Sequence, residues 1–146
     1  MNSELKETMN GLVADFAVLY MKLHHFHWYV KGSNFFTLHA KFEELYNEVT
    51  GYMDDVAERL LTVGEKPVST MKQFLELSTV KETEAVGTET EMVEAVINDF
   101  KTVDERLKKG IQLSADEGDD PTNDMLIGIS SSLEKHIWML RSYLGK

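Results

Sequence analysis

Residues 24–64 read HHFHWYVKGSNFFTLHAKFEELYNEVTGYMDDVAERLLTVG, and this stretch predicts two long helices joined by a tight turn. Apolar residues recur at steps of three and four on both sides of the turn, which is the spacing of one face of an α-helix. Gly32 and Asn34 interrupt the pattern and favour a turn over residues 31–34. Because this connection is short, the two helices are expected to run antiparallel and to pack against each other.

The same periodicity continues through the rest of the chain and predicts an all-α protein. Four long helices and one short helix are expected, over residues 3–30, 35–63, 69–77, 89–114 and 121–144. Helical content would be about 75–80%, far above the average of globular domains. We therefore expect a four-helix bundle with the short helix in a long crossover connection between the second and third long helices.

Polar residues and glycines mark the expected ends of these helices. Four residues are suited to cap the N-termini: Ser3, Ser69, Thr88 and Asp120. Glu91 would complete a capping box with Thr88, and Gly64 followed by Pro67 would end the second long helix. Gly51 lies inside that helix at a cost of about 1 kcal/mol relative to alanine, so another helix is expected to approach closely there.

Composition indicates one globular domain over residues 1–146, with 42% hydrophobic residues to form a core. No cysteine is present, so disulfides and thiolate metal sites are excluded. The net charge of −10 suits the attraction of cations and opposes binding to phosphate backbones. No signal-peptide core and no membrane-spanning apolar segment is found, which favours the cytoplasm.

Four candidate metal ligands lie in the opening stretch: His27, His39, Asp54 and Glu58. Asp54 and Glu58 are four residues apart and share one face of the second helix. His27 precedes the turn and His39 follows it, so the hairpin brings both imidazoles to about the same height. Mixed imidazole and carboxylate donors suit iron, zinc or manganese.

The two pairs cannot meet within one chain. His39 and Asp54 are fifteen residues apart on one helix, which is about 22 Å at 1.5 Å per residue. Metal–ligand bonds are only about 2.0–2.2 Å long. Either the chain carries two incomplete half-sites, or a two-fold axis near residues 46–49 sets the histidines of one copy beside the carboxylates of another. The spacing alone also allows packed histidines and a solvated acidic face.

The block HHFHWYVKGSNFFTLHAKFEELY…MDDVAERLLTVGEKP resembles the Dps family, the mini-ferritins. The likeness continues through KKGIQLSADEGDDPTNDML and KHIWMLRSYLG, so it covers nearly the whole chain. The resemblance implies a ferritin-like bundle whose inter-subunit ferroxidase site takes His27 and His39 from one subunit. Asp54 and Glu58 would come from its two-fold mate. The Glu-x-x-His pairs of ordinary ferritins are absent, because no histidine here follows a glutamate by three residues.

The resemblance also implies a function. Fe(II) would be oxidised at these sites, preferentially by hydrogen peroxide, and ferric oxide would be stored in a hollow dodecameric shell, giving protection against oxidative damage. Iron would be the bound metal, and Fe(II) and hydrogen peroxide the substrates. A shell of this kind would be a soluble homo-oligomer built from two-fold dimers.

Several further residues carry alternatives that the sequence leaves open. Glu43, four residues beyond His39, is either an outer ligand for a second iron or a solvated glutamate. Trp28 matches the tryptophan beside the iron site in the resembled family, and otherwise is an interface aromatic; Trp138 is either functional or part of the core. Asp120 and Asp124 either line a three-fold iron pore, as the resemblance suggests, or belong to a solvated loop and a helix cap.

Two other functions compete with iron storage. The first is DNA compaction, which members of the resembled family carry out mainly with lysine- or arginine-rich tails. Here the N-terminus offers only Lys6 between Glu4 and Glu7, and no basic stripe occurs elsewhere, so DNA binding is not expected. The second is a structural bundle without metal.

Overall fold

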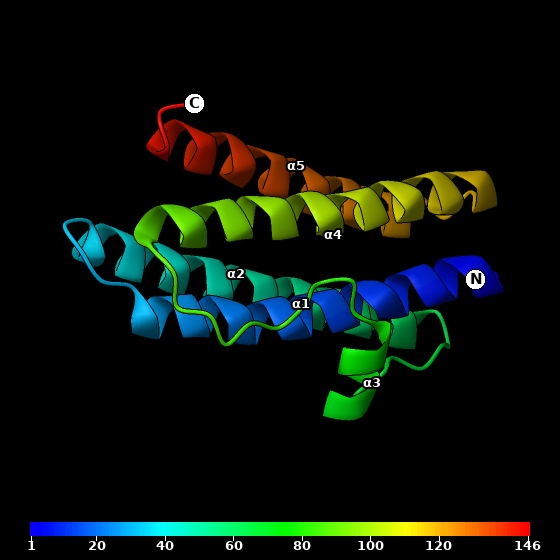
Figure 1. The fold of residues 1–146 in the computed structure, drawn as a ribbon. Coiled ribbons are helices and arrows are strands. Elements are labelled where there is room, and N and C mark those ends of the chain that lie inside the picture. Colours follow the sequence, from blue (N-terminus) through cyan, green and yellow to red (C-terminus); the bar gives the residue numbers. More distant parts are fainter.

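The computed structural model describes residues 1–146 as an antiparallel pair of helical hairpins (Figure 1). Its helices are α1 (Ser3–Tyr29), α2 (Phe35–Thr62), α3 (Met71–Leu77), α4 (Glu89–Glu117) and α5 (Asp120–Tyr143). The chain forms no strand. The predicted all-α architecture, four long helices with a short helix in the connection between the second and third, is therefore confirmed.

The long crossover follows from the direction of the helices. α2 and α4 run in the same direction, so residues 63–88 must return along the length of the bundle before α4 can start (Figure 1). This segment carries α3 on the outside of the bundle, where α3 packs against α1. No helix is long and apolar enough to cross a membrane.

The core is one cluster formed by the apolar faces that the periodicity predicts. It contains 29 buried residues, and its largest fully buried side chains include Phe16, Phe42 and Phe100 from α1, α2 and α4. Burying an aromatic side chain of this size contributes roughly 1.5–3 kcal/mol. The helices are thus held by a continuous apolar interior, and polar bridges fix their relative positions.

The predicted helix caps were correct at one of four N-termini. Thr88 and Glu91 form the capping box, but the predictions of Ser3, Ser69 and Asp120 were each wrong by one residue. The preceding or following neighbour caps instead: Asn2, Thr70 and Asp119. The side-chain oxygen of each of these three residues accepts a hydrogen bond from the backbone N–H three residues later. The adjacent polar residue does not reach that N–H. α4 also continues past the predicted residue 114, because Gly118 ends it in a left-handed conformation with φ +70°.

The crossover is anchored by the buried carboxylate of Asp15 on α1. Asp15 is fully buried. It accepts hydrogen bonds from the backbone N–H of Thr79 (2.7 Å) and the hydroxyl of Ser78 (3.1 Å), and it pairs with Arg106 of α4 at 3.0 Å. Gly11 lies against the Arg106 guanidinium, which leaves no room for a Cβ at this position. Three segments distant in the sequence therefore meet at one buried charge.

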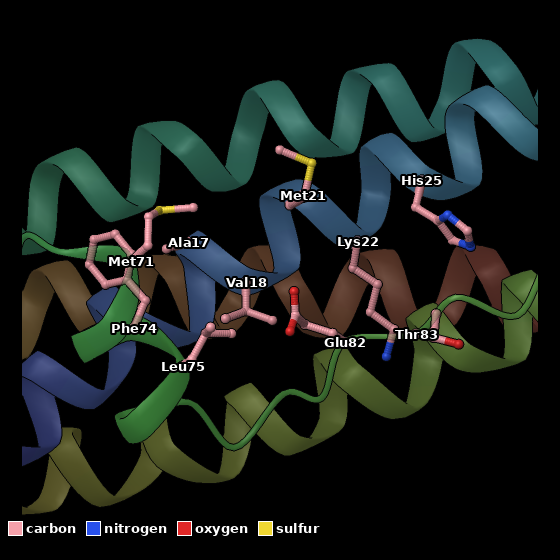
Figure 2. A pocket seen from close by; sticks show the side chains of 10 residues that line it. All are labelled: Ala17, Val18, Met21, Lys22, His25, Met71, Phe74, Leu75, Glu82 and Thr83. Atoms are coloured by element: carbon pink, nitrogen blue, oxygen red, sulfur yellow. The ribbon is translucent and has the colours of Figure 1, made fainter.

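α3 covers α1 beyond this anchor and leaves a small cavity of about 110 Å³ (Figure 2). Val18 of α1 lies toward Leu75 of α3, while His25 and Thr83 lie at the end of the cavity away from α3. None of the four candidate metal ligands lines this cavity. The cavity is a packing feature of the crossover and lies away from the predicted site.

Replacing Asp15 with alanine should destabilise the protein by about 2–3 kcal/mol, because the buried donors of the crossover and Arg106 lose their acceptor. Urea unfolding at fixed protein concentration measures the change. Glu76→Ala is the matched control, since Glu76 is exposed on α3, and it should shift stability by less than about 0.5 kcal/mol. Equal stability of the two variants would contradict the anchoring role.

Candidate metal centre

The two candidate histidines meet across the α1–α2 hairpin. His27 lies in the last turn of α1 and is buried, whereas His39 lies in the second turn of α2 and is half-buried. Their rings stack with centroids 3.7 Å apart and planes 13° apart. The Phe35 ring stacks on the His39 ring, and the two ring centroids are 4.9 Å apart. The predicted convergence of the two imidazoles is present in a single chain.

Reciprocal hydrogen bonds define the tautomer of both rings. Nδ1 of His27 lies 2.6 Å from the backbone oxygen of His39, and Nδ1 of His39 lies 2.7 Å from the backbone oxygen of His27. A backbone oxygen can only accept, so each Nδ1 carries the hydrogen and donates. In the neutral ring Nε2 then holds the lone pair, and this is the form that binds a metal ion.

The candidate carboxylates form a second, separate pair. Asp54 and Glu58 are exposed and lie one helical turn apart on α2. A side-chain hydrogen bond with Asp54, followed by the negative charge of Asp54, raises the pKa of Glu58. Two carboxylates that repel each other in this way gain most from a shared cation. The pair is therefore a candidate oxygen-rich half-site.

The single chain does not combine the two half-sites. No group of three or more histidine, aspartate or glutamate side chains is arranged to hold a metal ion. The helix rise separates His39 from Asp54 by about 22 Å along α2. One chain thus presents nitrogen donors at one end of α2 and oxygen donors at the other.

Glu43, predicted as a possible outer ligand, lies beside the histidine pair. Its Oε1 is 3.9 Å from Nε2 of His27. Sequence reasoning missed Tyr46, whose hydroxyl donates to the same oxygen over 3.3 Å. Desolvation, followed by the charge of Glu43, raises the pKa of Tyr46, which keeps the hydroxyl protonated as a donor. The signal for Tyr46 was its position seven residues after His39, on the same helical face.

The remaining candidates are spread over the surface. Trp28 is 62% exposed, with its ring centroid 5.2 Å from that of His24. Trp138 is 57% exposed, so the alternative that it belongs to the core is wrong. Asp120 and Asp124 are both exposed near the start of α5. The cap predicted for Asp120 belongs to Asp119, whose carboxylate accepts from Thr122 and pairs with Arg59 of α2.

Comparisons with known proteins identify the family to which the chain belongs. The Ferritin-like domain model matches residues 6–146. The chain is 51% identical to General stress protein 20U of Bacillus subtilis, over 99% of this chain and 100% of that protein. It is 49% identical to DNA protection during starvation protein 2 of Bacillus anthracis over the full length of both.

A solved structure gives the same fold. The chain superposes with a TM-score of 0.96 on a double histidine-to-glycine mutant of Dps from Listeria innocua, at 42% identity over 100% of this chain and 97% of that chain. The two replaced histidines are twelve positions apart, the separation of His27 and His39 here. The chain belongs to the ferritin-like proteins and, within them, to the Dps family of mini-ferritins.

The tautomers of His27 and His39 can be tested directly. Nitrogen-15 spectra of histidine-labelled protein, recorded above the titration range of histidine, should show hydrogen on Nδ1 and a bare Nε2 in both residues. Addition of Zn²⁺ should shift the Nε2 signals and leave the Nδ1 hydrogens in place. His25 is the internal comparison, because its Nε2 lies 2.8 Å from a backbone oxygen and must donate. Hydrogen on Nε2 of His27 or His39 would contradict the assignment.

Proposed function

We propose that this protein is a ferroxidase that stores and detoxifies iron. It oxidises Fe(II), preferentially with hydrogen peroxide, at sites shared between two-fold-related copies, and it deposits ferric oxide inside a hollow dodecameric shell in the cytoplasm. Residues 1–146 act as one ferritin-like domain in this proposal. The observation that carries it is the pair of stacked imidazoles, each with Nδ1 engaged and Nε2 free.

The chemistry of the donors supports iron as the substrate. His27 and His39 offer neutral nitrogen donors, and Asp54 with Glu58 offers anionic oxygen donors. Such mixed sets bind Fe(II) while leaving positions open for an oxidant. The absence of cysteine removes the ligands that would favour softer ions.

A second copy supplies the missing half-site in this proposal. A two-fold axis across the middle of α2 sets the histidines of each copy next to the carboxylates of the other, which yields two equivalent sites per dimer. Gly51 is exposed on α2, and no atom of its own chain lies within 4 Å of a Cβ added there, so this surface is open to a partner helix. Trp28 and Met21 on α1 also expose apolar surface that a partner could cover.

The oxidation balances without releasing a radical. Two Fe²⁺ ions lose one electron each, and one hydrogen peroxide takes both electrons and two protons to give two water molecules. Because both electrons arrive together, no hydroxyl radical forms. The Fe³⁺ ions then hydrolyse to oxyhydroxide and release protons. Asp120 and Asp124 would guide Fe²⁺ inward, since closely spaced carboxylates concentrate cations.

The shared site makes a sharp prediction about mixed assemblies. The double variant His27→Gly/His39→Gly and the double variant Asp54→Ala/Glu58→Ala should each lose fast peroxide-driven iron oxidation. The two variants are then unfolded, mixed in equal amounts and refolded. Half of the resulting dimers should contain one copy of each variant, and each such dimer restores one of its two sites. About a quarter of all sites should therefore be intact. Oxidation is followed by ultraviolet absorbance, and assembly by light scattering.

Refolding each variant alone provides the control and should restore no activity. If the mixture stays inactive although both variants assemble, the site is not shared between copies. If the histidine variant oxidises iron as fast as the unmodified protein, the ferroxidase assignment is wrong. If the unmodified protein binds no iron at all, a purely structural bundle is favoured.

DNA compaction is the competing function within the family, and a related protein bears the name DNA protection during starvation. The net charge of −10 opposes it, because phosphate contacts need clustered basic side chains. In a gel-shift assay at physiological salt, the assembled protein should leave plasmid DNA unretarded. A mobility shift that weakens with added salt would establish DNA binding and overturn this expectation.

A further inference from the structure

A cluster of aromatic side chains packs beside the histidine pair. His24 of α1 stacks on Tyr46 of α2, with ring centroids 3.7 Å apart and planes 17° apart. The His24 ring is itself held, because its Nδ1 donates to the backbone oxygen of Tyr20 over 3.0 Å. The Tyr20 ring packs edge-on against both of these rings. Its centroid lies 4.6 Å from that of His24 and 5.8 Å from that of Tyr46. The ring of Tyr46 is therefore oriented from α1.

Tyr46 in turn contacts two residues of the histidine half-site. Its hydroxyl donates to Oε1 of Glu43, and its ring meets that of His27 at 5.4 Å with planes 88° apart. The same Glu43 oxygen lies 3.9 Å from Nε2 of His27. Two atoms that bind one ion at about 2.0–2.2 Å can be at most about 4.0–4.4 Å apart. Both atoms can therefore reach a single cation.

The Glu43 side chain is oriented by Tyr46, which lies three residues further along α2. The Glu43 side chain is 55% exposed, and a solvated glutamate loses rotamer freedom when it binds an ion. A hydrogen bond from Tyr46 removes part of that freedom beforehand, which lowers the cost of binding. A carboxylate has about four acceptor positions, so this bond leaves Glu43 able to bind a cation.

We propose that Tyr46 is a positioning residue for iron binding: clamped by His24, it holds the Glu43 carboxylate beside Nε2 of His27 and so pre-forms one side of the iron site. This inference rests on the proposed function, because it assigns a role within the same site. Hydrogen bonds behind metal ligands commonly change metal affinity by about 10–100-fold. The hydroxyl of Tyr46, and not its aromatic ring, carries the effect.

The test compares Tyr46→Phe with Tyr20→Phe in the assembled protein. Both changes remove one hydroxyl from the same aromatic cluster, but only Tyr46 donates to Glu43. Calorimetric titration with Co²⁺, without peroxide, measures metal affinity independently of oxidation. Tyr46→Phe should weaken Co²⁺ binding about tenfold and raise the half-saturating Fe²⁺ concentration in the oxidation assay by a similar factor. Tyr20→Phe should match the unmodified protein in both measurements.

A double-mutant cycle separates positioning from a general structural role. In a Glu43→Ala background, Tyr46→Phe should cause no further loss of Co²⁺ affinity, because the carboxylate that it orients is gone. Unchanged affinity of Tyr46→Phe, or an equal loss in both backgrounds, would overturn the inference. The His27→Gly/His39→Gly variant keeps the two proposals apart: if it loses Co²⁺ while Tyr46→Phe does not, only the inference fails. If the His27→Gly/His39→Gly variant binds Co²⁺ normally, both the inference and the proposed function fail.

Discussion

Reciprocal hydrogen bonds between His27 and His39 fix the height at which α1 and α2 pack against each other. Each imidazole donates to the backbone oxygen of the other residue, so the two helices are joined by paired bonds at one height. The bond from His39 ends at the backbone oxygen of His27 in the last turn of α1, where backbone oxygens lack helical partners. The same bonds that close the hairpin also direct both Nε2 atoms away from the backbone. The two hydrogen bonds thus join α1 to α2 and, under the proposed function, also present the nitrogens that bind iron.

The stiffness of α2 determines how the chain can function. A helix of 28 residues keeps its two ends apart, so the carboxylates of Asp54 and Glu58 cannot reach the histidines of their own chain. Each chain therefore presents a nitrogen-rich and an oxygen-rich candidate half-site. Under the proposed function, assembly and catalysis become inseparable, because a protomer alone has no complete site.

Polar bridges between helices complement the apolar core. Asp15 ties the crossover and α4 to α1, while Arg59 joins α2 to the start of α5 through Asp119. The buried imidazole of His136 on α5 donates to Glu48 of α2 over 2.7 Å, which lowers the pKa of Glu48. Each of these charges is partnered, since an isolated buried charge would cost several kcal/mol. The bridges set the relative positions of helices whose apolar faces alone could slide.

Hydrophobic periodicity by itself determined the number, order and approximate limits of the helices, because a buried face must repeat with the helical turn. Spacing likewise determined that His27 and His39 converge and that the carboxylates do not join them. The caps at Asn2, Thr70 and Asp119 were decided only in three dimensions, since neighbouring polar residues compete for the same N–H groups. So were the tautomers of the histidines and the orientation of the Tyr46 ring, because the first depend on hydrogen bonds between α1 and α2 and the second on stacking with His24 of α1.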